Sequence, residues 1–236
     1  IFRHKIGSPT KEDVLIFEEK SEAFTVGVAL SSDEKNYFIT SSDHNTSEQY
    51  YFSVDEKNPK PKLIKKRKKG ILYSVNSWKG YFYNHTNEEA EDFKIERCKD
   101  LSNQKWEEYV SAKEEVLIGG LVFLNNWVIR SETSNALNKI FVKNVNNNQE
   151  EEIKFSDEQV IVPGISFVQR ERNTDLLYLS YSSPKTQNRT YLYNLKTKEK
   201  KLVKEQKIPS GHNSKDYIVE RLECKSHDGR MVPITI

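Results

Sequence analysis

The amino-acid sequence predicts an all-β protein, and within that class a β-propeller of about four complete four-stranded blades plus partial blades. Four apolar stretches begin roughly 45 residues apart, which matches the length of a propeller blade. Each stretch is followed by further short strands, separated by Asn, Asp, Ser or Pro. Tyr and Phe together outnumber Gly and Pro, and helical periodicity is almost absent. These four observations favour sheets throughout the chain.

Residues 1–19 are interpreted as the outer strands of a preceding, incomplete blade. The segment IFRHKIG is predicted to form one strand, SPTKED a turn, and VLIFEE a second strand that runs back beside the first. Ser and Pro in the central segment are typical of turns. Because the sequence begins without Met, we expect that further chain precedes it.

The first two complete blades are predicted at residues 20–68 and 69–113. The strands of the first are AFTVGVALS, YFIT, EQYYFSVD and PKLIKK. Those of the second are ILYSVNSWKG, GYFYNHT, DFKIERC and WEEYVSA. The segment NEEAEDFKIERCKDL is the best helical candidate, but its alternation from Phe93 through Ile95 to Arg97 indicates a strand in its second half.

The third and fourth blades are predicted at residues 114–157 and 158–206. The strands of the third are VLIGGLVFLNN, NNWVIRSE, NKIFVKNV and EEIKFS. Those of the fourth are VIVPGISFVQ, DLLYLSYSS, RTYLYNLK and KKLVKE. The four blades together span residues 20–206.

Burial explains why such units occur in series. A short meander cannot cover its own faces, so consecutive sheets stack and bury each other. The innermost strands lie at the crowded centre, which suits small residues, here Gly27, Ala29, Gly119, Gly120 and Gly164. Outer strands carry lysines that discourage edge-to-edge pairing.

Residues 207–236 follow the fourth blade and end in a predicted hairpin. Two alternating apolar segments, YIVERLECK and RMVPITI, flank the dipeptide Asp228-Gly229. This dipeptide is a strong signal for a hairpin turn.

The stretches HKIGSPTKEDVLIFEEKSEAFTVGVALSSDEKNYFITSSDHNTSEQYYFSVDE and DYIVERLECKSHDGRMVPITI carry a resemblance to a known family. They are similar to the prolyl oligopeptidase family of serine peptidases, and most closely to its oligopeptidase B (protease II) branch. With the intervening spacing the resemblance covers essentially the whole chain. It implies part of a seven-bladed propeller that caps an α/β-hydrolase domain, with residues 207–236 leading toward that domain, which we expect to be absent from this chain.

The resemblance implies a non-catalytic gating and substrate-access role in a peptidase that cleaves short peptides after basic residues. The catalytic Ser of such enzymes lies on a G-x-S-x-G turn. The sequence has no such motif, and PGISF around Ser166 lacks the second glycine. We therefore assign no catalytic residue and expect no activity unless the same chain or a separate chain supplies the hydrolase domain. The alternative is a stand-alone interaction module that forms homo-oligomers through exposed blade edges.

The charge balance and the cysteine content limit which kinds of partner and which cellular compartment we expect. Lys and Arg number 37 against 35 Asp and Glu, so charge gives no reason to expect nucleic acid or a membrane surface. Cys98 and Cys224 fit no metal-ligand spacing and suit a reducing compartment. No apolar run is long enough for a membrane span, and the first residues lack a signal-peptide pattern. We expect a cytoplasmic protein without a cofactor or metal site.

The histidines suggest catalysis or metal binding, but a structural role is favoured for each. His227 and Asp228 could be a base and its carboxylate, but the turn signal outweighs that interpretation. The other histidines are predicted at the surface or at strand ends, without a metal-ligand pattern: His4, His44, His85 and His212.

The basic run KPKLIKKRKKG from Lys60 is interpreted as a solvated outer strand, with Leu63 and Ile64 making its apolar contact. The alternative is a patch that binds anions or nucleic acid. The sequons at Asn84 and Asn188 match glycosylation sites, which matter only in a secreted protein.

Overall fold

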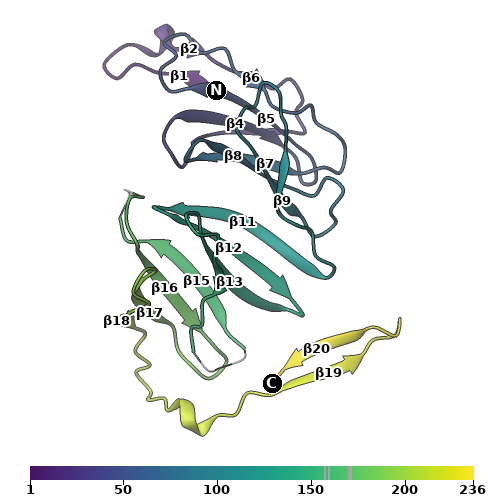
Figure 1. Cartoon of the computed structure of the whole chain (residues 1–236), viewed down its shortest axis with the longest axis vertical. Coiled ribbons are helices and arrows are strands. Elements are labelled where there is room, and N and C mark those ends of the chain that lie inside the picture. Colours follow the sequence, from purple (N-terminus) through teal and green to yellow (C-terminus); the bar gives the residue numbers. More distant parts are fainter. Residues whose placement is uncertain (157, 159, 170–171) are drawn as a thin grey trace. The chain divides into compact units, whose positions relative to one another are not determined.

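The computed structural model describes residues 1–156, 158, 160–169 and 172–236, and strands dominate it (Figure 1). The chain divides into two compact units, Ile1–Glu114 and Glu115–Ile236. Within the described ranges, helix is limited to two short 3-10 turns, η1 (Thr10–Glu12) and η2 (Ser214–Asp216). The all-β prediction is therefore confirmed.

The first unit holds two four-stranded antiparallel meanders, in the orders β3-β4-β5-β6 and β7-β8-β9-β10. The strands are β3 (Thr25–Leu30), β4 (Asn36–Ser42), β5 (Ser47–Ser53), β6 (Lys62–Leu63), β7 (Tyr73–Trp78), β8 (Tyr81–Thr86), β9 (Lys94–Cys98) and β10 (Glu107–Val110). The predicted crossing and return at the start form a two-stranded pair, β1 (Phe2–Arg3) and β2 (Val14–Leu15). Each strand overlaps the segment that the sequence pattern predicted, although β4 begins one residue earlier and ends two residues later than YFIT, and β5 begins one residue earlier than EQYYFSVD.

The turn between β7 and β8 illustrates how local chemistry sets register. Lys79 and Gly80 both have positive φ, 48° and 82°, as a two-residue type I′ turn requires. Trp78 therefore pairs directly with Tyr81, and the rest of the ladder follows in step to Tyr73 opposite Thr86.

The core of the first unit lies between its two large sheets. Phe38 from β4 and Tyr73 and Val75 from β7 are buried there, together with Ile64, Cys98 and Leu101. Tyr51, Phe82 and Trp106 pack against this cluster. Stacking of neighbouring sheets thus covers faces that neither meander covers alone.

The second unit repeats the pattern with the orders β11-β12-β13-β14 and β15-β16-β17-β18, and adds the hairpin β19-β20. The strands are β11 (Val116–Leu124), β12 (Trp127–Ser134), β13 (Leu137–Asn144), β14 (Glu150–Glu152), β15 (Val162–Phe167), β16 (Leu176–Ser182), β17 (Arg189–Asn194), β18 (Lys200–Glu205), β19 (Arg221–Lys225) and β20 (Met231–Thr235). Its core contains the fully buried Leu179 and Leu195, with Ile129 and Val142 from the neighbouring sheet.

The predicted crowding around small residues of the inner strands is confirmed at two of them, Gly119 and Gly164. A Cβ on Gly119 would lie 2.1 Å from the Ser131 hydroxyl, and one on Gly164 would lie 2.7 Å from that of Ser180. The prediction is wrong elsewhere: a Cβ on Gly27 or Gly120 would meet nothing within 4 Å, and Ala29 is exposed. β3, β11 and β15 are all edge strands of their sheets, so the difference lies in the adjacent strand, which places a serine side chain against Gly119 and Gly164 but none against Gly27.

Candidate functional site

The terminal hairpin has one apolar face that is largely exposed. Leu222 pairs with Ile234, and Cys224 pairs with Val232. Directly opposed residues of an antiparallel pair share a face, so these four side chains form the hairpin apolar face. Leu222, Val232 and Ile234 are 48%, 46% and 39% exposed. A two-stranded hairpin is marginal alone in water, so this face has the composition of a packing surface.

The hairpin turn lies at Asp228-Gly229, as predicted. Gly229 has a φ of 89° and donates its N–H to the Ser226 carbonyl at 3.0 Å. The Asp228 carboxylate accepts the backbone N–H of Arg230 at 3.1 Å, whereas the His227 ring is hydrogen-bonded to the Ser226 hydroxyl at 3.3 Å. The His227–Asp228 pair is therefore a turn and not a base with its carboxylate.

The segment before the hairpin and the first residue of β19 contact the ends of both large sheets of the second unit. His212 is hydrogen-bonded through Nε2 to the Lys185 carbonyl at 2.7 Å, and its ring stacks on Tyr217. The Arg221 guanidinium donates to the Asn135 carbonyl, in the β12–β13 turn. His212 was predicted at the surface or at a strand end, and its anchoring role was not predicted.

A polar cavity of about 490 Å³ lies beside this anchor. Lys185, Arg189 and Arg221 line it together with Glu158. Arg189 is bound to Glu205 at 2.6 Å, a hydrogen bond that raises the pKa of the guanidinium. Most of this charge is thus held by contacts within the unit.

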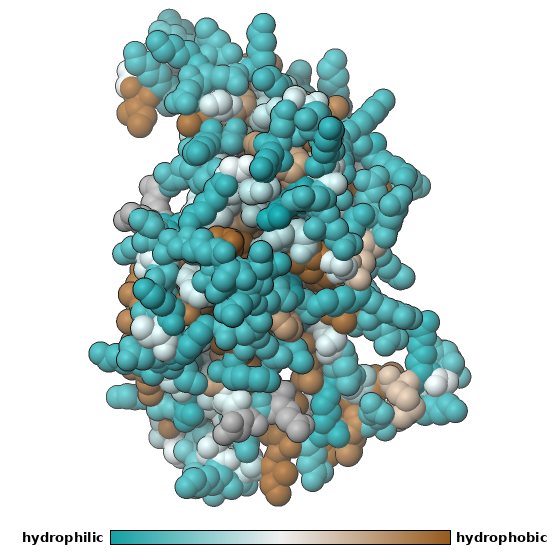
Figure 2. Space-filling view, viewed as in Figure 1, coloured by the Kyte–Doolittle hydropathy of each residue, from teal (hydrophilic) through white to brown (hydrophobic). Residues whose placement is uncertain are grey.

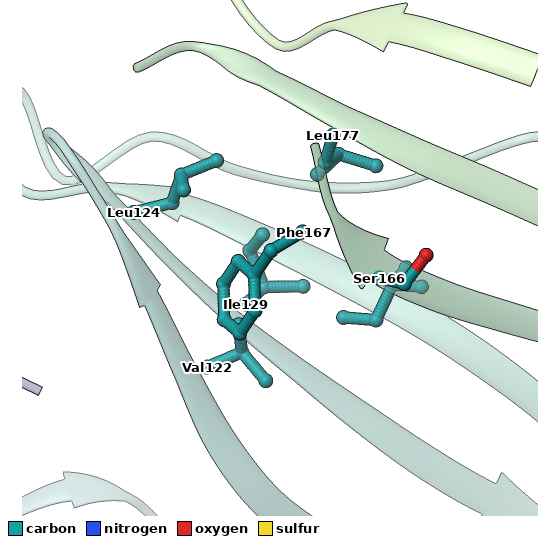
Figure 3. A pocket seen from close by; sticks show the side chains of 7 residues that line it. Val122, Leu124, Ile129, Ser166, Phe167 and Leu177 are labelled. Carbon is teal, nitrogen blue, oxygen red and sulfur yellow. The ribbon is translucent and has the colours of Figure 1, made fainter. Parts of the chain in front are cut away.

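An apolar cavity of about 220 Å³ lies between β11 and β12 on one side and β15 and β16 on the other (Figure 3). Its lining comprises Val122, Leu124, Ile129, Ile165, Phe167 and Leu177, with Ser166 as the one polar member. None of these residues could act as a base toward the Ser166 hydroxyl. The cavity suits an apolar group rather than hydrolysis at Ser166.

Elsewhere most of the visible surface is hydrophilic, and hydrophobic side chains reach it in separate patches (Figure 2).

The basic run from Lys60 is only partly a solvated strand. Lys65 forms ion pairs with Glu88 at 3.4 Å and Glu96 at 3.0 Å. Ile64 is buried, in agreement with the predicted apolar contact, whereas Leu63 is 43% exposed. The run therefore supplies cations to the inside of the first unit as well as to its surface.

Arg67, from the same run, lies at the centre of an ionic network. Its guanidinium is 2.5 Å from Glu19 and 3.2 Å from Glu48. The Ser41 hydroxyl donates to Glu19 at 2.6 Å, and this bond, with Arg67, lowers the pKa of Glu19 from 4.5 to about 2. Burial opposes ionisation of Glu48, but hydrogen bonds from Tyr50 and Arg67 lower its pKa overall.

Arg130 forms a second network, in the second unit. It is 4% exposed and donates to Glu132 at 2.8 Å and to both carboxylate oxygens of Glu150, at 2.5 and 2.9 Å. Its guanidinium also lies over the Phe141 ring. Neither network was predicted, because the partners are distant in sequence or are two charges within one strand.

The remaining histidines do not converge. His4 lies 2.6 Å from the Asp13 carboxylate, His85 stacks on Phe93, and His44 lies in the loop between β4 and β5. Across the part of the chain that the structure describes, no group of three or more His, Cys, Asp or Glu side chains is arranged to hold a metal ion.

The sequons and cysteines differ in accessibility. Asn84 is fully buried and donates to Glu96 at 2.9 Å, so a glycan cannot be attached there in the folded state, whereas Asn188 is exposed. Cys98 is buried and Cys224 exposed, and both are free thiols.

None of the helices among the described residues is long and apolar enough to cross a membrane.

Comparison with known proteins identifies the domain class. Residues 1–206 match the family model of the prolyl oligopeptidase N-terminal β-propeller domain. The four-stranded meanders are thus blades of a β-propeller domain. The chain belongs to the prolyl oligopeptidase family.

Individual relatives agree with this assignment. Protease 2 from Moraxella lacunata is 28% identical over 100% of this chain and 34% of its own length. Dipeptidyl aminopeptidase BI from Pseudoxanthomonas mexicana is 27% identical over 99% of this chain and 32% of its own. The chain therefore spans about a third of the length of these curated relatives.

Solved structures show the same fold. Oligopeptidase B from Trypanosoma brucei, with covalently bound antipain in a closed form, has a TM-score of 0.90 and 26% identity over 99% of this chain and 34% of its own. Oligopeptidase B from Leishmania major has a TM-score of 0.87 at 20% identity over the same shares, and it supports the fold alone.

Proposed function

We propose that this chain is the gating and substrate-access portion of an oligopeptidase B-like serine peptidase that cleaves short peptides after basic residues. Membership of the propeller family and the similarity to Protease 2 and to oligopeptidase B support this proposal. The sequence carries no G-x-S-x-G motif, so catalysis belongs to a hydrolase domain in the same chain or another. The propeller portion is inert alone.

The hairpin apolar face is the observation that carries the proposal. Three of its side chains, Leu222, Val232 and Ile234, are about two-fifths to one-half exposed, and exposed apolar surface of this kind marks an interaction site. We propose that a hydrolase domain packs against it. The blades would then act by steric selection, because a rigid wall of stacked sheets excludes folded proteins and admits short peptides.

A chimera tests this function. The matching third of Moraxella lacunata Protease 2 is replaced by this chain, and turnover of a fluorogenic peptide with Arg before the scissile bond is measured. We expect turnover by the chimera, none by the purified chain, and a large loss in a chimera that carries Ile234→Lys. Lys225→Glu, on the opposite face of the hairpin, is the matched control. Turnover by the purified chain would overturn the proposed division of labour, and so would a properly folded but inactive chimera.

The cytoplasm is the proposed location. Cys98 and Cys224 are both free thiols, which suits a reducing compartment.

Self-association is a second candidate function, favoured by the outer strand β18. Every residue of this strand is exposed, including Leu202 and Val203 at 45% and 47%. Strand edges with exposed apolar residues recruit a second strand. Static light scattering over a hundredfold range of concentration separates the candidates: a rise in molar mass supports self-association, and a constant monomer mass contradicts it.

A further inference from the structure

A polar cavity of about 550 Å³ opens at one end of the two large sheets of the second unit. Its walls come from the start of β12, the β13–β14 turn and the β17–β18 turn. They combine one indole ring, amide groups and carboxylates: Trp127, Asn144, Gln149, Glu150 and Glu151. An aromatic face beside carboxylates is the chemistry that binds an organic cation.

A side chain of the protein already occupies this cation site. The ammonium group of Lys198 forms an ion pair with Glu151 and lies 5.3 Å from the centroid of the Trp127 ring. The ring is held in place because its Nε1 donates to the Asp175 carboxylate at 2.8 Å. Desolvation lowers the pKa of Lys198, so its surroundings partly exclude water.

The two carboxylates of the cavity differ in their freedom to exchange partners. Glu150 is bound by both terminal nitrogens of the buried Arg130, at 2.5 and 2.9 Å. The Lys198 and Glu151 side chains are 42% and 51% exposed, and exposed ion pairs contribute little stability. An incoming cation can therefore displace Lys198 at small cost and leave the Arg130 network intact.

We propose that this cavity binds an arginine side chain of an extended peptide in exchange for Lys198. A guanidinium is planar, so it can stack on the Trp127 ring while it donates two parallel hydrogen bonds to Glu151. The amide oxygens of Asn144 and Gln149 each accept one hydrogen bond within the protein, and each has a second lone pair that can accept another. The inference rests on the proposed function, because it gives the access portion its own contact with peptides that carry basic residues. Lys198 then acts as an internal competitor that keeps the affinity low.

The test measures binding to the purified chain by isothermal titration calorimetry. The probes are an acetylated, amidated Gly-Arg-Gly peptide and its citrulline analogue, which keeps the shape and loses the charge. We expect weak binding of the arginine peptide, affinity about fivefold higher in Lys198→Ala because a weak competitor is removed, and loss of binding in Glu151→Gln. Lys196→Ala is the matched control, because Lys196 lines the same cavity and its removal changes the net charge equally.

Three results would overturn the site: equal binding of the citrulline peptide, equal gains in Lys198→Ala and Lys196→Ala, or no binding by any variant. Unchanged thermal unfolding of each variant confirms that its fold is intact. The assay needs no catalysis, so its failure is separate from that of the proposed function. If the chimera is active but the arginine peptide does not bind, the proposed site is contradicted and the proposed function stands. If the peptide binds but the chimera is inactive, the proposed function is contradicted and the site stands.

Discussion

The guanidinium of Arg67 lies 2.5 Å from the carboxylate of Glu19, 48 residues earlier in the chain. The contact joins the segment before the first large sheet to the chain that follows the outer strand of that sheet. Arg67 also lies over the Phe24 ring, 4.2 Å from its centroid. Because Arg67 also pairs with Glu48 in β5, this one cation joins three separate pieces of the first unit.

Replacement of this cation should destabilise the first unit. Arg67→Met removes the partner of two carboxylates whose side chains are only 9% and 5% exposed. We expect the free energy of unfolding to fall by about 2 kcal/mol, because carboxylates left without their cation keep their desolvation cost. Urea denaturation measures the change. Arg230→Met is the control, because Arg230 is 88% exposed and 3.9 Å from Asp228, and it should change stability by less than about 0.5 kcal/mol.

The same network predicts a pH dependence. The pKa of Glu19 is lowered from 4.5 to about 2 in the folded state. A lowered folded-state pKa stabilises the fold above the unfolded-state pKa, and this contribution is lost as pH falls toward the folded-state pKa. The urea midpoint of the wild type should therefore exceed that of Glu19→Gln at neutral pH. The gap should shrink between about pH 4.5 and pH 2, and a gap that stays constant over that window would contradict the assignment.

The core of the second unit predicts a large cavity effect. Leu179 is fully buried between the two large sheets, so Leu179→Ala should lower the free energy of unfolding by about 3 kcal/mol. Leu202→Ala removes the same atoms from a side chain that is 45% exposed, and it should cost well under half as much. Equal costs for the two variants in chemical denaturation would show that the core is misplaced.

Two glycines of the inner strands should respond differently to the same substitution. Gly119→Ala places a Cβ 2.1 Å from the Ser131 hydroxyl and 3.1 Å from its carbonyl, and we expect a loss of about 2 kcal/mol from overpacking. Gly27→Ala meets nothing within 4 Å and should be neutral or slightly stabilising. Thermal unfolding of both variants gives the comparison.

The strands were predictable because their signals are local. Alternation in YFIT or RTYLYNLK and turn residues such as Asp228-Gly229 act over a few positions, and the repeat near 45 residues multiplies that information by four. The open space at Gly27 was not predictable, because it depends on which side chain the adjacent strand places against the glycine. That is a property of tertiary packing rather than of the strand itself.

The ionic networks and the cavities could not be predicted from the sequence for a related reason. Stacking of the sheets is needed to bring Glu19 to Arg67 and Lys198 to Glu151. The local sequence around each of these residues does not indicate its partner. Glu48 and Arg130 do give a weak signal, since each is a charge inside a predicted strand. A charge at such a position indicates that a partner exists without indicating where it lies.

The two thiols give the molecule a built-in reporter. Burial raises the pKa of Cys98 to about 11, so this sulfur stays protonated and shielded near neutrality. Cys224 is exposed among the apolar side chains of the terminal hairpin. A maleimide dye should therefore label one position of the native chain, and its emission would change colour when another protein surface covers that hairpin.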